Sequence, residues 1–183
     1  MPTRRRSKIE TILFTDIEGS TRQGELTPAA MGVAVGHHNN ILSEAIAVNQ
    51  GEVLKTIGDS FQASFDDPGA ALVAAVSVQR ALTAEPWEQL GVSDVRVRMA
   101  LHTGSLTWDK TKRDYEWAPM LNHVARLMAA ANGGQILLSR ATAELVRGAL
   151  PEGISLHDHG EHRLQRYQTA HAGISGASRR FTN

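Results

Sequence analysis

The sequence predicts an α+β fold in which helices pack on one face of a mainly antiparallel sheet. Strand and helix patterns follow one another in the order β-α-β-β-α-β over roughly the first hundred residues. A chain of 183 residues that is 42% apolar and 21% charged is long and apolar enough for one sizeable core. We therefore expect one domain over residues 9–170, a basic tail over residues 1–8 and a C-terminal tail over residues 171–183.

The pattern up to residue 65 predicts a central strand, a helix and a hairpin. Residues 9–16 are rich in β-branched and aromatic side chains and are nearly apolar on both faces from Ile12 on, which is typical of a central strand. A helical pattern covers residues 28–49. Strands at 52–56 and 61–65 are close enough in sequence to form a hairpin.

The remaining chain predicts a second helix and strand, followed by a series of shorter elements. Asp67 and Pro68 have the residue types of an N-cap and a first helical position, and the apolar pattern continues to Leu82. Residues 95–101 alternate apolar with mostly polar positions, which indicates a half-buried strand. We then expect a hairpin or loop at 108–117, a helix at 119–131, a short strand at 135–138, a capped helix at 139–146 and a terminal pair of strands at 154–164.

Composition and charge exclude several classes of protein. Lys plus Arg is 19 and Asp plus Glu is 19, so a nucleic-acid surface that depends on bulk positive charge is not expected. The absence of cysteine excludes disulfide scaffolds, thiolate zinc sites and cysteine nucleophiles. The longest apolar run, residues 70–76, is far shorter than the roughly 20 residues that span a bilayer, and the basic N-terminus has no apolar signal segment. A cytoplasmic protein without stable membrane insertion is expected.

Two acidic residues lie at the ends of predicted strands. Asp16 directly follows the first apolar strand, and Asp59 lies in the turn of the predicted hairpin. If these strands are neighbours, both carboxylates reach one edge of the sheet, where hard oxygen ligands suit Mg²⁺ or Mn²⁺. The alternative interpretation is that each Asp only makes a turn.

Two further groups of residues have the composition of a phosphate or nucleotide site. Gly19, Ser20 and Thr21 precede a helix, so that their backbone N–H groups could surround phosphates, or the hydroxyl residues could simply cap the helix. Asn122 and Arg126 are spaced i, i+4 and share one helix face. That face is either a solvated polar stripe or a pair that holds a ribose and a phosphate.

The eight histidines suggest no metal centre. His157 and His159 point the same way on a strand, but no third ligand is evident nearby, so we interpret them as solvated. The same interpretation applies to three histidines in helical stretches, His37, His38 and His123.

Five motifs together make the sequence resemble a known family. They are FTDIEGST (14–21), LKTIGD (54–59), LHTG (101–104), NHVARL (122–127) and GEHRL (160–164). In this order and spacing they resemble the class III nucleotide cyclase catalytic domain, the adenylate and guanylate cyclase family, over residues 9–167. The resemblance implies a ferredoxin-like, palm-type fold and a head-to-tail homodimer in which both subunits build each active site.

The resemblance also implies roles for individual residues. Asp16 and Asp59 would ligate two divalent ions, Mn²⁺ or Mg²⁺, with the carbonyl of Ile17 as a further ligand. From the other subunit, Asn122 would orient the ribose and Arg126 would stabilise charge on the α-phosphate. The reaction would convert a nucleoside triphosphate into a 3′,5′-cyclic nucleotide and pyrophosphate.

Two departures from the family pattern concern the metal turn and the triphosphate. The usual Gly after the second metal-binding Asp is Ser60 in this chain. The Lys that binds the triphosphate in the family is replaced by Gln165, so Arg163 or Arg166 would have to substitute for it.

The third departure concerns the base. Adenylate cyclases pair a Lys with an Asp seven residues before the catalytic Asn; Lys55 matches the Lys, but the second position is Tyr115. A bulky ring beside a retained ammonium favours a smaller base with carbonyl oxygens, which is uracil. Asp114 is adjacent, and a one-residue slip would restore the adenine pattern.

The chain also resembles the pyrimidine cyclases of bacterial anti-phage defence, the Pycsar systems, whose cyclic UMP or cyclic CMP activates a separate effector. We expect a uridylate cyclase, with adenylate cyclase as the alternative. Guanylate cyclase comes third, because that class normally carries Glu where Lys55 stands. A cyclase-like domain that binds nucleotide without turning it over is the hypothesis from a different class.

Overall fold

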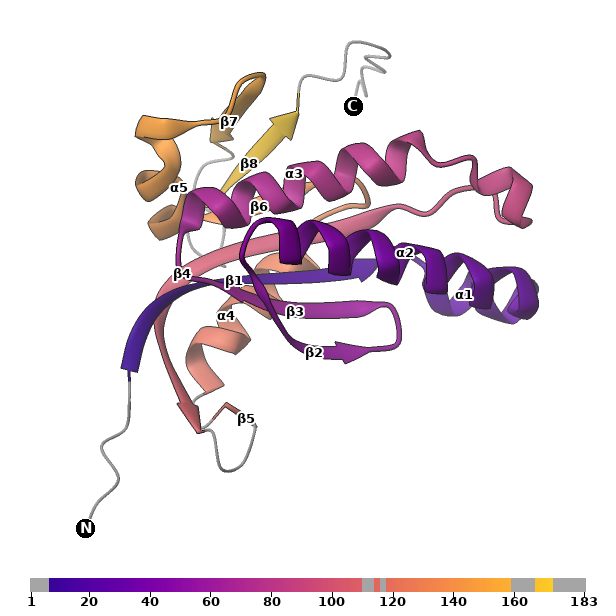
Figure 1. Ribbon diagram of the computed structural model, residues 1–183, viewed down its shortest axis with the longest axis horizontal. Helices are drawn as coiled ribbons and strands as arrows, with labels where there is room; N and C mark the ends of the chain where they lie inside the picture. Colours follow the sequence, from indigo (N-terminus) through magenta and orange to yellow (C-terminus); the bar gives the residue numbers. More distant parts are fainter. Residues whose placement is uncertain (1–6, 110–113, 116–117, 159–166, 173–183) are drawn as a thin grey trace.

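One mixed sheet forms the centre of the molecule (Figure 1). The computed structural model describes residues 7–109, 114–115, 118–158 and 167–172. The strands are β1 (Ser7–Ile17), β2 (Glu52–Ile57), β3 (Ser60–Phe65), β4 (Val97–Asp109), β5 (Asp114–Tyr115), β6 (Ile136–Ser139), β7 (Ile154–Asp158) and β8 (Tyr167–Ala172). Their order is β2-β3-β1-β4-β6-β8-β7, with β5 paired to the end of β4. Only β4 and β6 pair in parallel among these strands, which confirms the mainly antiparallel sheet.

Helices cover both faces of this sheet. They are α1 (Ser20–Leu26), α2 (Pro28–Val48), α3 (Pro68–Ala84), α4 (Ala118–Ala129) and α5 (Arg140–Val146), with short 3₁₀ turns η1 (Trp87–Leu90) and η2 (Arg147–Ala149). Helices α2 and α3 lie side by side on one face, whereas α4 lies on the other (Figure 1). The prediction that the helices share one face is therefore wrong.

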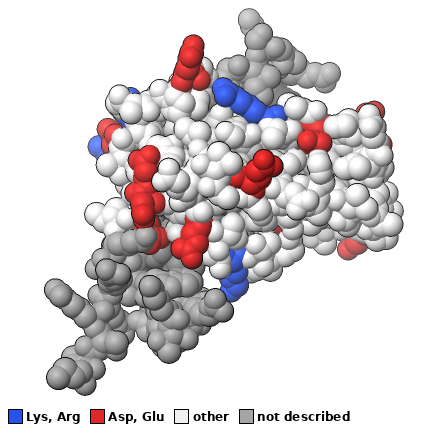
Figure 2. Space-filling model, viewed as in Figure 1, with Lys and Arg blue, Asp and Glu red and all other residues white. Residues whose placement is uncertain are grey.

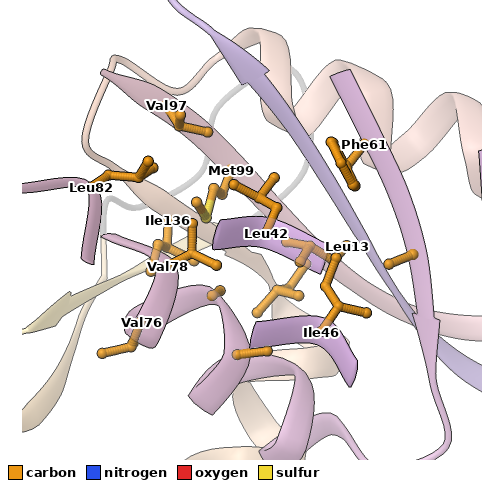
Figure 3. Packing of buried hydrophobic residues seen from close by; sticks show 14 of the residues in the cluster. Leu13, Leu42, Ile46, Phe61, Val76, Val78, Leu82, Val97, Met99 and Ile136 are labelled. Atoms are coloured by element: carbon orange, nitrogen blue, oxygen red, sulfur yellow. The ribbon is translucent and has the colours of Figure 1, made fainter. Parts of the chain in front are cut away.

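The two-sided arrangement follows from the alternation of side chains along β1. Leu13 and Met99 belong to the larger core beneath α2, α3 and α5 (Figure 3). Leu138 belongs to the same core. Ile12 and Phe14 point to the opposite face and belong to a second core beneath α4. Because successive side chains of a strand face opposite ways, a strand apolar on both faces needs cover on each side.

The helix cap and the hairpin turn predicted from the sequence are present in the structure. The Asp67 side chain caps α3 by accepting from the Gly69 and Ala70 backbone N–H groups at 3.2 and 2.9 Å. Gly58 has a φ of 61°, the left-handed conformation that lets the β2–β3 hairpin turn tightly. The hairpin predicted there is confirmed.

The C-terminal strand pair differs from the prediction. β7 begins at Ile154 as expected, but its partner β8 spans Tyr167–Ala172 rather than ending by Leu164. β8 also pairs with β6, so it joins β7 to the main sheet. This long-range pairing fixes the position of β8, and a local pattern cannot show it.

The surface over α2 and α3 carries few charges (Figure 2). Among Asp, Glu, Lys and Arg, α2 contains only Glu44 and α3 contains only Arg80. Over the described residues, Lys and Arg occur on this face only at scattered positions. None of the helices described is long and apolar enough to cross a membrane.

Candidate functional site

The structure brings Asp16, Ile17 and Asp59 together at one end of the sheet. β3 pairs with β1 so that Phe61 lies opposite Thr15, which places the β2–β3 turn beside the end of β1. The backbone N–H of Ile17 donates to Asp59 Oδ2 at 3.1 Å. The two candidate carboxylates therefore meet at the same sheet edge, although 42 residues separate Asp59 from Ile17 in the sequence.

Two further side chains hold the Asp16 carboxylate. Ser60 Oγ donates to Asp16 Oδ1 at 2.7 Å. Arg98 donates to Asp16 Oδ2 twice, from Nε at 3.0 Å and from Nη2 at 2.6 Å. In the sequence, Arg98 is only a polar position of an alternating strand. Its role depends on the β1–β4 register, in which Asp16 and Arg98 are direct partners.

The donor set at this edge fits Mg²⁺ or Mn²⁺. The carboxylates of Asp16 and Asp59 and the carbonyl of Ile17 are all hard oxygen ligands. Within the ranges that the structure describes, no group of three or more His, Cys, Asp or Glu side chains could hold a metal ion. Two carboxylates suffice for Mg²⁺, which usually keeps several waters and binds substrate phosphates in addition.

The loop after β1 leads into a short helix without a side-chain cap. Gly19 is the N-cap of α1 with a φ of 72°, and no side chain caps the helix. Ser20 and Thr21 are the first two helical residues, so the interpretation that they cap the helix is wrong. The first N–H groups of a helix have no partner within the helix. Glu18 anchors this loop, since its Oε1 accepts from the Gly133 N–H at 3.1 Å.

Helix α4 presents Asn122 and Arg126 away from the sheet. Both side chains are exposed. The opposite face of the helix is buried in the second core, where Met120 is 4%, Val124 0% and Leu127 2% exposed. Packing of this apolar stripe fixes the orientation of the Asn122 and Arg126 positions.

Two imidazole rings contact each other where α4 meets β4. The rings of His102, on β4, and His123 have centroids 4.4 Å apart and are tilted by 32°. His102 Nδ1 forms a 2.9 Å hydrogen bond with Ser139 Oγ. Burial, and secondarily His123, lowers the pKa of His102 to about 4, and burial and Arg126 lower the pKa of His123. Both rings are therefore neutral at pH 7, and His123 is partly buried rather than fully solvated.

His38 also differs from its predicted solvated state. Its side chain is fully buried on α2, with Nδ1 bonded to Asn39 Oδ1 at 2.9 Å and the ring edge-on to Phe61. Burial lowers the pKa of His38, so the ring is neutral. His37 is partly exposed and lies 2.8 Å from Glu85. His157 is exposed on β7, and His159 lies outside the described residues.

The structure gives the face of the sheet on which Lys55 lies and the strand position of Tyr115. Lys55 is exposed and pairs with Gln62, which in turn pairs with Phe14. Because directly opposed residues share a face, Lys55 lies on the α4 side of the sheet. Tyr115 lies on β5 opposite Trp108.

The candidate triphosphate residues Arg163 and Arg166, like Gln165, lie outside the described residues, so the structure says nothing of them.

Sequence and structure comparisons identify the family. A sequence model described as the adenylate and guanylate cyclase catalytic domain matches residues 3–173. The chain belongs to this family. The class III nucleotide cyclase domain and the palm-type α+β fold expected from the five motifs are thereby confirmed.

Several relatives resemble the chain in sequence. An uncharacterized protein of Mycobacterium tuberculosis is 35% identical over 157 residues, which cover 85% of this chain and 51% of that protein. An adenylate cyclase of Lachancea kluyveri is 35% identical over 152 residues, covering 70% of this chain and 8% of that enzyme. The chain thus spans at most about half the length of these relatives.

Solved structures share the fold. The adenylyl cyclase CyaB from P. aeruginosa superposes with a TM-score of 0.79 at 23% identity, covering 92% of this chain and 95% of that one. A double mutant of a guanylyl cyclase domain from Blastocladiella emersonii gives a TM-score of 0.78 at 14% identity, with coverages of 93% and 98%. Because an adenylyl and a guanylyl cyclase fit about equally well, the fold does not select the base.

Proposed function

We propose that this chain converts a nucleoside triphosphate into a 3′,5′-cyclic nucleotide and pyrophosphate. The observation that carries the proposal is the convergence of Asp16, Ile17 and Asp59 at one sheet edge, through the Ile17 N–H to Asp59 contact of 3.1 Å. A domain that only bound nucleotide would have no chemical need for two metal-binding carboxylates together with Asn122 and Arg126.

In this proposal, Asp16, Asp59 and the Ile17 carbonyl hold two divalent cations. The chemistry that such cations supply is a lowered pKa of the ribose 3′-hydroxyl and neutralisation of the triphosphate charge. The Ile17 N–H orients the Asp59 carboxylate, so that this side chain is positioned before substrate arrives.

The active site is composite in this proposal, with Asn122 and Arg126 supplied by a second copy of the chain. A Cβ atom placed on Gly104 would lie 3.2 Å from Met120 Sδ. The start of α4 therefore lies beside Gly104 and its β1 partner Glu10. From there α4 runs toward the Asp16 end of the sheet, since Gly133, four residues past the end of α4, donates to Glu18. Asn122 and Arg126 are exposed on the side of α4 that faces away from this chain's own core, which supports a head-to-tail dimer in which one protomer's α4 meets its partner's carboxylates.

Asn122 orients the ribose, and Arg126 stabilises charge that develops on the α-phosphate. The backbone N–H groups of Gly19, Ser20 and Thr21, which adjoin the metal residues, bind the triphosphate.

Arg163 or Arg166 supplies the positive charge at the triphosphate that Gln165 cannot provide.

UTP is the proposed substrate, because Tyr115 puts a bulky ring where adenylate cyclases carry the Asp that accepts from the adenine amine, which favours a smaller base, while Lys55 retains a donor for a carbonyl oxygen. ATP is the second candidate, and the observation that favours it is that fungal relatives 32–35% identical to this chain are named adenylate cyclases. A role for cyclic UMP as a second messenger in anti-phage defence, acting on a separate effector, rests on the resemblance alone. It predicts that cyclic UMP accumulates in cells during infection.

Incubation of the purified protein with each of the four nucleoside triphosphates and Mn²⁺ tests the activity. Pyrophosphate release is followed, and the nucleotide product is identified by mass spectrometry. We expect equal amounts of pyrophosphate and cyclic nucleotide, with UTP turned over fastest. ATP turned over far faster than UTP would overturn the base assignment and leave the cyclase reaction intact. No product from any of the four would support the binding-only alternative.

A further inference from the structure

Asp16 is the most heavily engaged side chain of the proposed metal site. Its Oδ1 accepts from Ser60 Oγ at 2.7 Å, and its Oδ2 accepts from both Nε and Nη2 of Arg98 at 3.0 and 2.6 Å. The partners come from different strands, β3 and β4, on either side of β1. Both oxygens that a cation would use are thus already hydrogen-bonded within the chain.

The contact between Arg98 and Asp16 is of a strong type. Two N–H groups of one guanidinium on a carboxylate form charge-assisted hydrogen bonds, which are about twice as strong as neutral ones. The side chains are only 31% and 20% exposed, so water screens the pair less than it screens a surface ion pair. Binding of a divalent cation at Asp16 would break these hydrogen bonds, and the positive charge of Arg98 would repel the cation.

We propose that Arg98 and Ser60 act as a clamp on Asp16 with which the divalent cation competes. The inference rests on the proposed function, since it takes Asp16 as a metal ligand. Arg98 and Ser60 are positioning residues in this view, and they set the affinity of the site for the cation. Asp59 has a different partner, the Ile17 backbone N–H, which carries no net charge and does not repel a cation. The clamp therefore acts on one ligand of the pair.

The test measures Mn²⁺ binding to the full chain without nucleotide, by the loss of the electron paramagnetic resonance signal of free Mn²⁺. Arg98→Met keeps an unbranched apolar stem and removes the charge and the donors. We expect it to bind Mn²⁺ about tenfold more tightly than wild type. Ser60→Ala removes one neutral donor and should tighten binding about twofold to threefold. Arg98→Lys keeps the charge and should remain within about twofold of wild type.

Asp16→Asn is the matched control for the metal assignment and should weaken Mn²⁺ binding at least about tenfold. Unchanged or weaker binding by folded Arg98→Met and Ser60→Ala, with Asp16→Asn impaired, would overturn the clamp and leave the metal site standing. Mn²⁺ binding that is unaffected by Asp16→Asn would overturn the clamp and the metal assignment together. No saturable Mn²⁺ binding by any variant would do the same. Circular dichroism checks that each variant is folded, and if Arg98→Met unfolds, Ser60→Ala decides the outcome.

Discussion

Replacement of Asp59 by Asn separates the chemical role of this residue from its structural one. Asp59 Oδ2 accepts the Ile17 N–H at 3.1 Å, and the amide oxygen of Asn can accept the same bond. Asn is also well suited to a turn beside Gly58. The free energy of unfolding should therefore fall by only about 0.5–1 kcal/mol, the difference between a charged and a neutral acceptor. Loss of the proposed carboxylate ligand should lower turnover at least about 10²–10³-fold.

Pyrophosphate release and thermal unfolding of the same preparation are the two assays for Asp59→Asn. Asp67→Asn is a matched control, because Asp67 caps α3 by accepting from Gly69 and Ala70 N–H groups and Asn is an equally good N-cap. The control should keep wild-type turnover. Near-normal turnover in folded Asp59→Asn would refute the assignment of Asp59 as a metal ligand.

Three further substitutions test other parts of the account. Tyr115→Asp restores an acceptor for the adenine amine and should raise the ratio of ATP to UTP turnover at least about tenfold; an unchanged ratio would contradict the role of Tyr115. The pKa of His102 falls from 6.5 to about 4 on folding. Between pH 4 and pH 6.5 the ring is neutral when folded and protonated when unfolded, so stability is lost as the pH falls from 6.5 toward 4. The shift corresponds to about 3 kcal/mol, which solvent screening of this partly exposed ring reduces to about 1–2 kcal/mol. The free energy of unfolding in urea should therefore depend less on pH in His102→Asn than in wild type. Leu127→Ala should lower the free energy of unfolding by about 2–5 kcal/mol in the same assay, and a cost below about 1 kcal/mol would contradict the packing of α4 on the sheet.

Local sequence signals predicted the elements, but they did not predict which face of the sheet each helix covers. The apolar character of β1 on both faces correctly indicated a central strand. Its consequence, a helix on each face, depends on α4, which lies about a hundred residues further along the chain. The amphipathic pattern of α4 shows that one of its sides is buried, but it does not show against which face of the sheet.

The carboxylates of the candidate site were predictable because both lie at strand ends that a short hairpin brings together. Arg98 was not, because its contact with Asp16 depends on the β1–β4 register between residues 82 apart in sequence. For His38 a local signal was available: it falls on the buried helical stripe of α2 formed by Met31, Ala34, His38, Leu42 and Ile46. The periodicity of that stripe predicts burial, whereas residue type alone suggested solvent exposure.

Mixing two inactive variants tests the composite cyclase site most directly. Asp16→Ala lacks a proposed metal ligand and Arg126→Ala lacks the proposed transition-state cation, so each protein alone should release no pyrophosphate from any nucleoside triphosphate. In a two-fold dimer, random exchange of equal amounts makes half of the dimers mixed, each with one intact site, so the mixture should recover about a quarter of wild-type turnover. No recovery, with subunit exchange demonstrated by native mass spectrometry, would contradict a site shared between two copies of this chain.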